Sequence, residues 1–420
     1  MSDFVTLGGH IIIQKGKAPL ATGYSGPGAE PYLNPEYLRG RASAELAEPG
    51  PDAVRARHGD TILLWDGSNA GEFFRAKSGL VASTMAKITP SAGFNPAYFF
   101  HAVKHAESYL KGQTTGTGIP HVDRELLEAI RVFCPAPAEQ LRVAEILDHL
   151  DTAILQTEAI VAKLKALKKG LLHDLLTRGI AANGELRPPQ SEAPNLYKES
   201  PLGWIPREWH VNQLEELLAD VDPAMRAGPF GSALLKEELV EVGLPLLGID
   251  NVHTERFVAT FTRLVTPRKF AQLERYAVRP EDLMITIMGT VGRCCLVPKD
   301  IGKALSSKHT WTISLNQEAY SPYLAMLQVN YSPWVLGHFA RDQQGGTMAA
   351  IRSETLRSTR FPVPPREEQR LMEDRLRVLS KRIDLEIDSL SKRHSERAGL
   401  MDDLFTGRVR VTPLLVEAAQ

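Results

Sequence analysis

One long stretch of this chain occurs twice, and its two copies align without a gap. The first copy runs from Cys134 to Ile180 and the second from Val363 to Val409. Their identical pairs share one offset: Pro135/Pro364, Glu139/Glu368, Gln140/Gln369, Ile154/Ile383, Leu171/Leu400, Asp174/Asp403, Leu175/Leu404 and Thr177/Thr406. One inserted residue would turn every later side chain of a helix by about 100°. The ungapped match therefore predicts a helix of fixed length in each copy and a duplicated protein.

The two copies predict long helices, from about Ala138 to Thr177 and from Arg366 to about Thr406. Apolar residues recur at alternating spacings of three and four, which is typical of a seam that needs a partner helix. The predicted seam consists of Leu147, Leu150, Ile154, Val161, Leu164, Leu376, Leu379, Ile383 and Leu390. About 40 helical residues measure about 60 Å, which is wider than most single cores. We expect an antiparallel coiled coil with the modules at opposite ends; a helix lying on its own domain is the alternative.

Each long helix follows a globular module, and the two modules repeat the same order of elements. We predict two strands in each module that correspond to two strands in the other. We also predict one corresponding helix in each module, which begins at a proline. In the first module the strands are predicted at Asp60 to Trp65 and at Ser78 to Ile88, and the helix at Pro96 to His105. In the second module, Asp282 to Gly289 matches Asp60 to Gly67, Ala304 to Ile313 matches Ala82 to Ile88, and Pro322 to Met326 matches the helix that begins at Pro96. Their offset drifts along the modules and reaches that of the repeated stretch only at the long helix. Loops have therefore changed length within the modules, whereas the helices have not.

These patterns divide the chain into six segments. They are a first module at 1–136, a long helix at 137–179, a linker at 180–203, a second module at 204–365, a second long helix at 366–408 and a tail at 409–420. The linker is predicted from composition, because residues 181–194 contain three prolines and few apolar side chains. The expected fold class is α+β: two mixed α/β modules separated by two long helices that form an antiparallel coiled coil, with an internal pseudo-two-fold repeat.

The composition is that of a globular protein with little net charge. Apolar residues make up 43%, and the formal net charge is -1. A DNA-binding protein of this composition would therefore need either a local concentration of Lys and Arg or positive surface supplied by its partners. The three cysteines, Cys134, Cys294 and Cys295, cannot build a disulfide framework, which favours a reducing compartment. Because no secretion signal and no apolar run of about 18 residues is present, we expect a cytoplasmic protein without a membrane partner.

The sequence contains no strong catalytic or metal-binding motif. The segment Asn95-Pro-Ala-Tyr98 resembles the Asn/Asp-Pro-Pro-Tyr/Phe motif of amino-methyltransferases, but it lacks the second proline and no glycine-rich cofactor fingerprint precedes it. We interpret it as the start of a helix. The phosphate-binding loop of ATP motors is absent, and histidines such as His101 and His309 do not have the spacing of metal ligands. We therefore expect no catalytic residue, no metal site and no cofactor in this chain.

The repeated stretch resembles the DNA-specificity subunit of type I restriction-modification systems at both of its ends. The similar segments are Pro135 to Gln140 with Leu171 to Gly179, and Pro364 to Gln369 with Leu400 to Arg408. The resemblance covers essentially the whole chain, since Tyr197 to Trp209, Asp66 to Glu72 and Met288 to Arg293 are also similar to recurring family segments. In one departure, Thr177-Arg-Gly179 reverses the order of Thr406-Gly-Arg408, which a simple C-terminal turn tolerates.

The resemblance implies that each module is a target recognition domain for one half of a bipartite, asymmetric double-stranded DNA site. It also implies that the coiled coil sets the spacer and docks two methyltransferase (modification) subunits, and that restriction/translocase subunits join the complex. The chain itself would be non-catalytic, and S-adenosylmethionine, ATP and Mg would be used by the partner subunits. A rigid helix pair suits this role, because half-sites on B-DNA lie one turn of about 34–36 Å, or a multiple, apart.

DNA contacts are expected from loop residues that can donate hydrogen bonds to bases or phosphates. Arg and Lys pair with guanine, and Gln with adenine, in the major groove. The candidates are Lys15, Lys17, Arg75, Lys77 and Gln113 in the first module, and Arg226, Lys308, Arg341, Gln343 and Gln344 in the second. For each of them, an ordinary solvated surface residue is the alternative interpretation.

Two other classes of function are compatible with the residues alone. A two-headed coiled-coil scaffold or protein-binding module without DNA specificity would form complexes that are insensitive to salt. An autonomous methyltransferase would have to bind its cofactor as the isolated chain.

Overall fold

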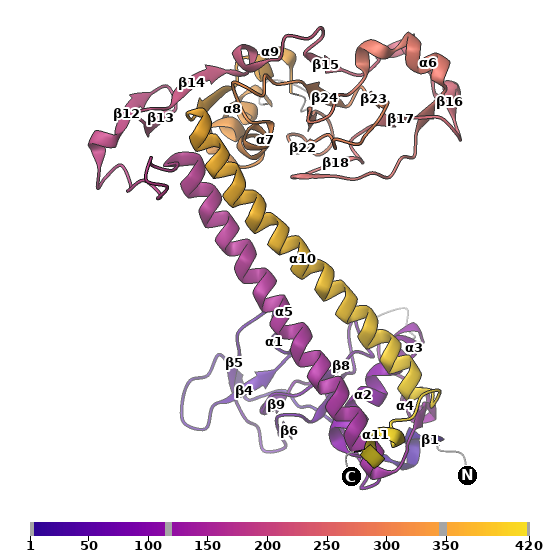
Figure 1. Ribbon diagram of the computed structural model, residues 1–420. Helices are drawn as coiled ribbons and strands as arrows, with labels where there is room; N and C mark the ends of the chain where they lie inside the picture. The colour runs from indigo at the N-terminus through magenta and orange to yellow at the C-terminus, as the bar shows by residue number, and fades with distance from the viewer. Residues whose placement is uncertain (1–3, 114–119, 344–350, 418–420) are drawn as a thin grey trace. The chain divides into compact units, whose positions relative to one another are not determined.

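Two long helices dominate the computed structural model, which describes residues 4–113, 120–343 and 351–417 (Figure 1). They are α5 (Pro137–Thr177) and α10 (Arg366–Phe405), and both agree with the predicted bounds to within a residue. The chain divides into unit 1, Met1–Ile160 with Glu386–Gln420, and unit 2, Val161–Leu385. Each unit therefore contains one globular module together with a part of each long helix.

Each module is built on a four-stranded antiparallel sheet. In unit 1 its order is β2 (Ile11–Lys15), β10 (Met85–Pro90), β7 (Thr61–Leu64) and β8 (Phe73–Arg75). In unit 2 its order is β15 (Met225–Ala227), β24 (Thr310–Ile313), β21 (Leu283–Thr286) and β22 (Cys294–Leu296). Every residue of β7 and β21 is buried, as their apolar sequences require. The equal strand orders confirm the predicted internal repeat.

A second sheet flanks the first in each module. It contains β3 (Ala21–Thr22), β5 (Glu45–Glu48), β4 (Glu30–Leu33), β9 (Gly79–Val81) and β6 (Arg55–Ala56) in unit 1, and β16 (Leu239–Val240), β20 (Leu264–Val265), β17 (Leu244–Leu247) and β23 (Leu305–Ser306) in unit 2. The single strand predicted at 78–88 is wrong, because β9 joins β4 in the second sheet and β10 joins β7 in the first. The strand predicted at 304–313 is broken in the same way, between β23 and β24.

Shorter elements complete the modules. They are β1 (Phe4–Thr6), α1 (Pro35–Leu38), α2 (Pro96–His105), α3 (Glu107–Gly112), α4 (Arg124–Ala129), β11 (Arg131–Phe133) and α11 (Thr412–Glu417) in unit 1, and β12 (Tyr197–Ser200), β13 (Gly203–Pro206), β14 (His210–Gln213), β18 (Val252–His253), β19 (Arg256–Phe257), α6 (Pro267–Gln272), α7 (Pro322–Tyr331), α8 (Pro333–Gln343), α9 (Ser353–Arg357) and β25 (Arg360–Val363) in unit 2. Strand β1 pairs with β11 and β14 pairs with β25, so the first and last strands of each module close it. The described residues include no helix that is long and apolar enough to cross a membrane.

Helix α2 confirms that the Asn95-Pro96 segment is a helix start. The Asn95 side chain accepts hydrogen bonds from the Ala97 and Tyr98 amides at 3.0 and 3.1 Å. Pro96 occupies the first helical position, where a missing N–H costs nothing. At the equivalent start of α7, Ser321 caps the Leu324 amide. This segment is thus explained by helix capping.

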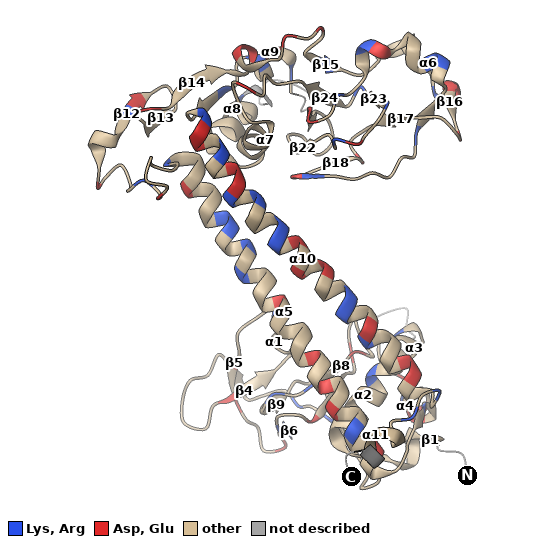
Figure 2. Cartoon of the chain, in the orientation of Figure 1, with Lys and Arg blue, Asp and Glu red and all other residues tan. Residues whose placement is uncertain are grey.

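Within each unit, the segments of α5 and α10 lie side by side and run antiparallel (Figure 1). In unit 1, Arg397 pairs with Asp151, and His394 lies 3.7 Å from Glu158. The residue number therefore decreases along α10 in the direction in which it increases along α5, which is the antiparallel arrangement. The predicted seam residues are all buried or half-buried: Leu147, Ile154, Val161, Leu376 and Ile383 are buried, and Leu150, Leu164, Leu379 and Leu390 are half-buried. Charged residues of both signs follow one another along α10 (Figure 2), which leaves this stripe as its apolar face.

The repeated Glu-Gln pair explains why each long helix starts where it does. Gln140 donates to the Gly93 and Pro135 carbonyls at 3.0 and 2.9 Å and accepts from the Asn95 amide at 2.8 Å. Gln369 makes the equivalent bonds, to the Ala319 and Pro364 carbonyls and from the Ser321 amide. Each glutamine therefore ties its long helix to the first residues of α2 or α7, so the orientation of the module is set at the helix start.

The adjacent glutamates hold the ends of the other helices. Glu139 accepts from the Arg410 guanidinium at 2.7 and 2.8 Å and from the Val411 amide, just after α10 ends. Glu368 accepts from the Arg187 guanidinium and from the Ile180 amide at 2.8 Å, just after α5 ends. The start of each long helix is thereby bonded to the segment that follows the other.

The segment predicted as a linker is folded. Strands β12 and β13 form a hairpin within and just beyond it, and Ile180, Arg187 and Tyr197 are buried. Its prolines did exclude a continued helix, as predicted. Composition failed to show that buried contacts to residues far along the chain, such as Glu368, would order it.

Candidate nucleic-acid interface

The predicted DNA-contact residues Lys15 and Lys17 in unit 1, and Lys308 in unit 2, lie at equivalent edges of the two central sheets. Strands β2 and β15 are each followed by a glycine, Gly16 and Gly228. A Cβ on either would lie 2.1 Å from a carbonyl oxygen, of Ala82 or of Ser306. Only glycine fits there, because backbone meets backbone where the chain passes from one sheet to the other. Lys15 and Lys17 flank this crossing in unit 1, and Lys308 follows it in unit 2.

Lys15 and Lys17, at this edge of unit 1, are both exposed. Lys15 Nζ lies 3.0 Å from Asp66 Oδ2 and 5.6 Å from the centre of the Trp65 ring. Such an exposed ion pair contributes little, about 0–1 kcal/mol, so a DNA phosphate could replace the carboxylate. Lys17 forms no ion pair with any described residue and is accessible to an anion.

The equivalent edge of unit 2 carries a cluster of basic side chains. Lys308 is exposed, and the adjacent His309 places Nδ1 3.3 Å from the sulfur of Met288. Burial, followed by the charges of Lys308 and Arg263, lowers the pKa of His309. The Arg263 guanidinium in turn pairs with Asp250. The cluster is thus positive through Lys308, because Asp250 compensates Arg263, and its histidine is held towards the neutral form.

Equivalent hairpin loops border these edges. The loop after β7 begins at Asp66, and the loop after β21 begins at Met288. Their closures match: Gly71 N donates to Leu64 O, and Gly292 N donates to Thr286 O, both at 2.8 Å. These are the segments 66–72 and 288–293 that resemble recurring family segments, and they lie at corresponding places in the two modules.

Lys77 and Arg75 differ in accessibility. Lys77 is exposed, with Nζ 4.1 Å from the centre of the Tyr37 ring. Arg75 stacks on Phe100 at 4.8 Å and donates to Asp148 on α5 at 2.7 Å. The structure therefore gives Arg75 a role in fastening the module to its long helix, and leaves Lys77 as a surface cation.

Arg226 is buried, which corrects its interpretation as a loop residue that contacts DNA. Its side chain pairs with the buried Asp282 and donates to the Ala277 carbonyl at 2.7 Å. Ser314 also donates to Asp282, at 2.5 Å. Arg226 lies on β15, and the whole pair is enclosed within the module. It acts as a structural cation of the core.

The remaining candidates lie at or beyond the ends of α3 and α8. Gln113 is exposed directly after α3, and Arg341 is exposed on α8. Gln343 is the last residue of α8, and the structure describes its backbone but not its side chain. Gln344 lies outside the described residues altogether.

Sequence reasoning missed two basic residues, Arg263 and Arg360. Arg360 is exposed at the start of β25 and lines a pocket with Arg341. A usable signal was the charge of Arg360 at the start of an otherwise apolar run, Phe361 to Val363, all of which is buried. Among the described residues, no group of three or more His, Cys, Asp or Glu side chains could hold a metal ion.

Comparison with known proteins identifies the family. The model of the type I restriction modification DNA specificity domain matches residues 2–166 and 257–392. The chain therefore belongs to the type I restriction-modification DNA specificity family, as its repeat and sheet topology indicate. It is similar to the type I restriction enzyme MjaVIII specificity subunit of Methanocaldococcus jannaschii, with 28% identity over 419 residues, 98% of this chain and 94% of that protein.

More distant relatives share the same organisation. The type I restriction enzyme EcoBI specificity subunit of Escherichia coli is 20% identical over 335 residues, 80% of this chain and 69% of that protein. The crystal structure of the S subunit of a type I restriction-modification system from M. genitalium has a TM-score of 0.62 at 15% identity, and the match covers 96% of this chain and 95% of that one. The fold predicted from the repeat is thus that of solved S subunits.

Proposed function

We propose that this chain is the DNA sequence-specificity subunit of a type I restriction-modification complex, with one target recognition domain for each half of a bipartite, asymmetric site. The observation that carries the proposal is the duplicated module. Both copies present basic residues at the same edge of the same sheet, Lys15 and Lys17 in one and Lys308 in the other. Two related but unequal surfaces suit two unequal half-sites.

The helix pair is proposed to set the spacer between the half-sites. Gln140 and Gln369 fasten each module to the start of its own long helix by equivalent hydrogen bonds. A helix has a fixed rise of 1.5 Å per residue, so a module fastened at its start is held at a defined distance along it. Flexible linkers would not define that distance.

The outer faces of the long helices support docking of methyltransferase subunits. Apolar side chains that are exposed there are Leu141, Leu155, Ile160 and Leu167 on α5, and Val378, Leu385 and Ile387 on α10. Burial of these side chains by another chain would remove apolar surface from water. We propose two methyltransferase subunits and associated restriction/translocase subunits as partners. Methylation and cleavage, with S-adenosylmethionine, ATP and Mg, then belong to those chains, and this one is non-catalytic.

Methylome sequencing tests the proposal directly. Cells that express this chain with its methyltransferase partner should carry adenine methylation at one bipartite, asymmetric sequence. Replacing the first module with that of another specificity subunit should change one half of the sequence only, and replacing the second should change the other half. Methylation that stays the same after both exchanges would refute the assignment of one half-site to each module.

A further inference from the structure

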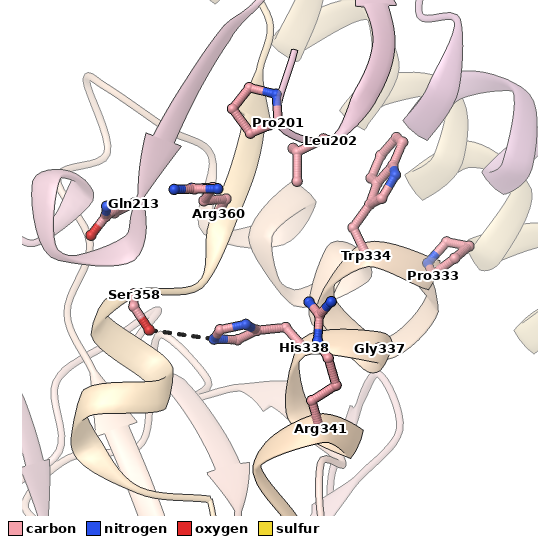
Figure 3. Close-up of a pocket in the computed structure, with 10 residues that line it drawn as sticks. All are labelled: Pro201, Leu202, Gln213, Pro333, Trp334, Gly337, His338, Arg341, Ser358 and Arg360. Atoms are coloured by element: carbon pink, nitrogen blue, oxygen red, sulfur yellow. Dashed lines mark hydrogen bonds between the residues drawn. The ribbon is translucent and has the colours of Figure 1, made fainter.

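A pocket of about 500 Å³ opens in unit 2, outside the sheet edge described above (Figure 3). It lies between the β12–β13 hairpin, which contributes Pro201 and Leu202, and helix α8, which contributes Trp334 and Arg341. Arg360, from β25, enters from another side. Three separate parts of the module thus converge on one space large enough for a polar group and its neighbours.

The charge in this pocket is uncompensated. None of its ten lining residues is acidic, and two are arginines. Within the described part of the chain, the side chains of Arg341 and Arg360 form no hydrogen bond and no ion pair. Nearby arginines differ, since Arg357 pairs with Glu215 at 3.0 Å. In a chain with a formal net charge of -1, two guanidinium groups without carboxylates around one pocket create a local anion site.

His338 and Trp334 complete the chemistry of the wall. The Nε2 of His338 lies 3.0 Å from the Thr355 carbonyl oxygen, which can only accept, so Nε2 carries a proton. The ring is thereby fixed in the wall of the pocket. Trp334 and Leu202 give the pocket an apolar side, which suits the sugar that adjoins a phosphate. Guanidinium groups match the oxygens of phosphate with paired hydrogen bonds.

We propose that this pocket binds one phosphodiester group of the DNA backbone beside the half-site that the second module reads. The inference rests on the proposed function and adds to it a contact that fixes position without reading sequence. DNA is favoured over an acidic protein partner because Arg341, which lines the pocket, is itself one of the residues from which the sequence predicts DNA contacts.

The first module provides an internal control, because the elements that line this pocket differ among its described residues. Arg131 is the counterpart of Arg360 under the offset of the long helices, and it too is exposed at the start of its strand. Its guanidinium, however, lies over the Phe4 ring at 5.6 Å. Helix α3 ends at Gly112, and the described residues of unit 1 include no counterpart of the β12–β13 hairpin. The phosphate site is therefore specific to one half of the duplicated protein.

The test measures DNA affinity of the full chain with its methyltransferase partner across a range of salt concentrations. The variants are R341Q, R360Q and the double variant, with R131Q as the matched control. For the double variant, the slope of log affinity against log salt should fall by about one, because a phosphate contact is lost. Target and non-target duplexes should lose affinity by the same factor, and R131Q should match the wild type.

Each other outcome overturns the proposal in a recognisable way. A double variant with wild-type affinity and slope would refute the pocket while leaving the proposed function intact. Loss on the target duplex alone would mean base reading, and unchanged DNA binding with weaker methyltransferase association would assign the pocket to a protein carboxylate. Absence of DNA binding by the wild-type complex would remove the proposed function as well. Equal thermal unfolding of all variants excludes a general folding defect.

Discussion

The sharpest prediction concerns the two glutamates that hold the helix ends. Glu368 is 7% exposed, and its carboxylate accepts hydrogen bonds from the Ile180 amide and from Arg187, which is 6% exposed. Substitution of Glu368 by Gln leaves the buried Arg187 cation with a single carboxylate partner, Glu208, which lies 3.4 Å away and is 54% exposed. Breaking a buried ion pair costs about 3 kcal/mol here, the lower end of the usual range, because Glu208 still compensates part of the charge.

The counterpart substitution, Glu139→Gln, should cost less. Glu139 is equally buried, but the side chain of its partner Arg410 is 40% exposed. Water can therefore solvate the guanidinium after the carboxylate is lost. Only the hydrogen bonds to the charged group disappear, which corresponds to about 1.5–3 kcal/mol. We expect Glu368→Gln to be the more destabilising of the pair by roughly 1 kcal/mol.

Hydrogen exchange of the full chain separates the two effects, because the Ile180 and Val411 amides donate to the two glutamates. Local measurement is needed, since two units need not unfold together. Glu368→Gln should lower protection at Ile180 more than Glu139→Gln lowers it at Val411. A double variant, R187M with E368Q, removes both buried charges and should recover part of the loss. Equal losses at the two sites, or no recovery in the double variant, would refute the reasoning from burial.

Three further predictions follow from single side chains. The Arg410 guanidinium holds the pKa of Glu139 below its ordinary value of 4.5, so this contribution is complete above pH 4.5 and is lost as the pH falls towards the lower folded-state pKa. Glu139→Gln should therefore flatten the acid limb of a stability–pH curve; an unchanged limb would contradict it. Lys15→Gln and Lys308→Gln should each reduce the salt slope of DNA binding by about one in an anisotropy titration, whereas unchanged slopes would remove them from the interface. Arg226→Gln should destabilise unit 2 by about 3–5 kcal/mol in urea unfolding, by stranding Asp282, and a stable variant that loses only DNA affinity would restore its original interpretation.

The long helices could be predicted closely because their signal is local and rigid. A fixed turn per residue converts an ungapped repeat into a helix boundary, which is why α5 and α10 begin and end where expected. Helix α2 was equally clear, since Asn95 and Pro96 are a cap and a first helical residue. The repeated order of strands also survived, because the buried runs β7 and β21 are short and bounded by polar residues.

What the sequence concealed depends on partners far along the chain. The alternation of residues 78–88 is the same whether they pair with β4 or with β7. The chain leaves one sheet for the other at Ala82, where Gly16 packs against the backbone, and the alternation gives no sign of this. Arg226 was placed at the surface because nothing near it shows that Asp282 lies beside it in the core. A charged side chain is usually exposed, so burial of a pair is visible only in three dimensions.

The hydrogen bonds of Glu139 and of Glu368, here called the two clamps, also constrain how the length of the spacer can change. In unit 2 the start of α10 is bonded to the segment after α5, and in unit 1 the start of α5 is bonded to the segment after α10. The two helices must therefore keep matched lengths between the clamps. Inserting seven residues into α5 alone should break one clamp and lower the midpoint of thermal unfolding.

The same insertion in both helices preserves the seam, because seven residues are two turns of a coiled coil. It should leave both clamps intact and lengthen the unspecified spacer of the methylated site without altering either half-site. A single insertion that unfolds no more easily than the paired one would refute the matched-length argument. Methylation with altered half-sites and an unchanged spacer would show that the helices do not set the distance at all.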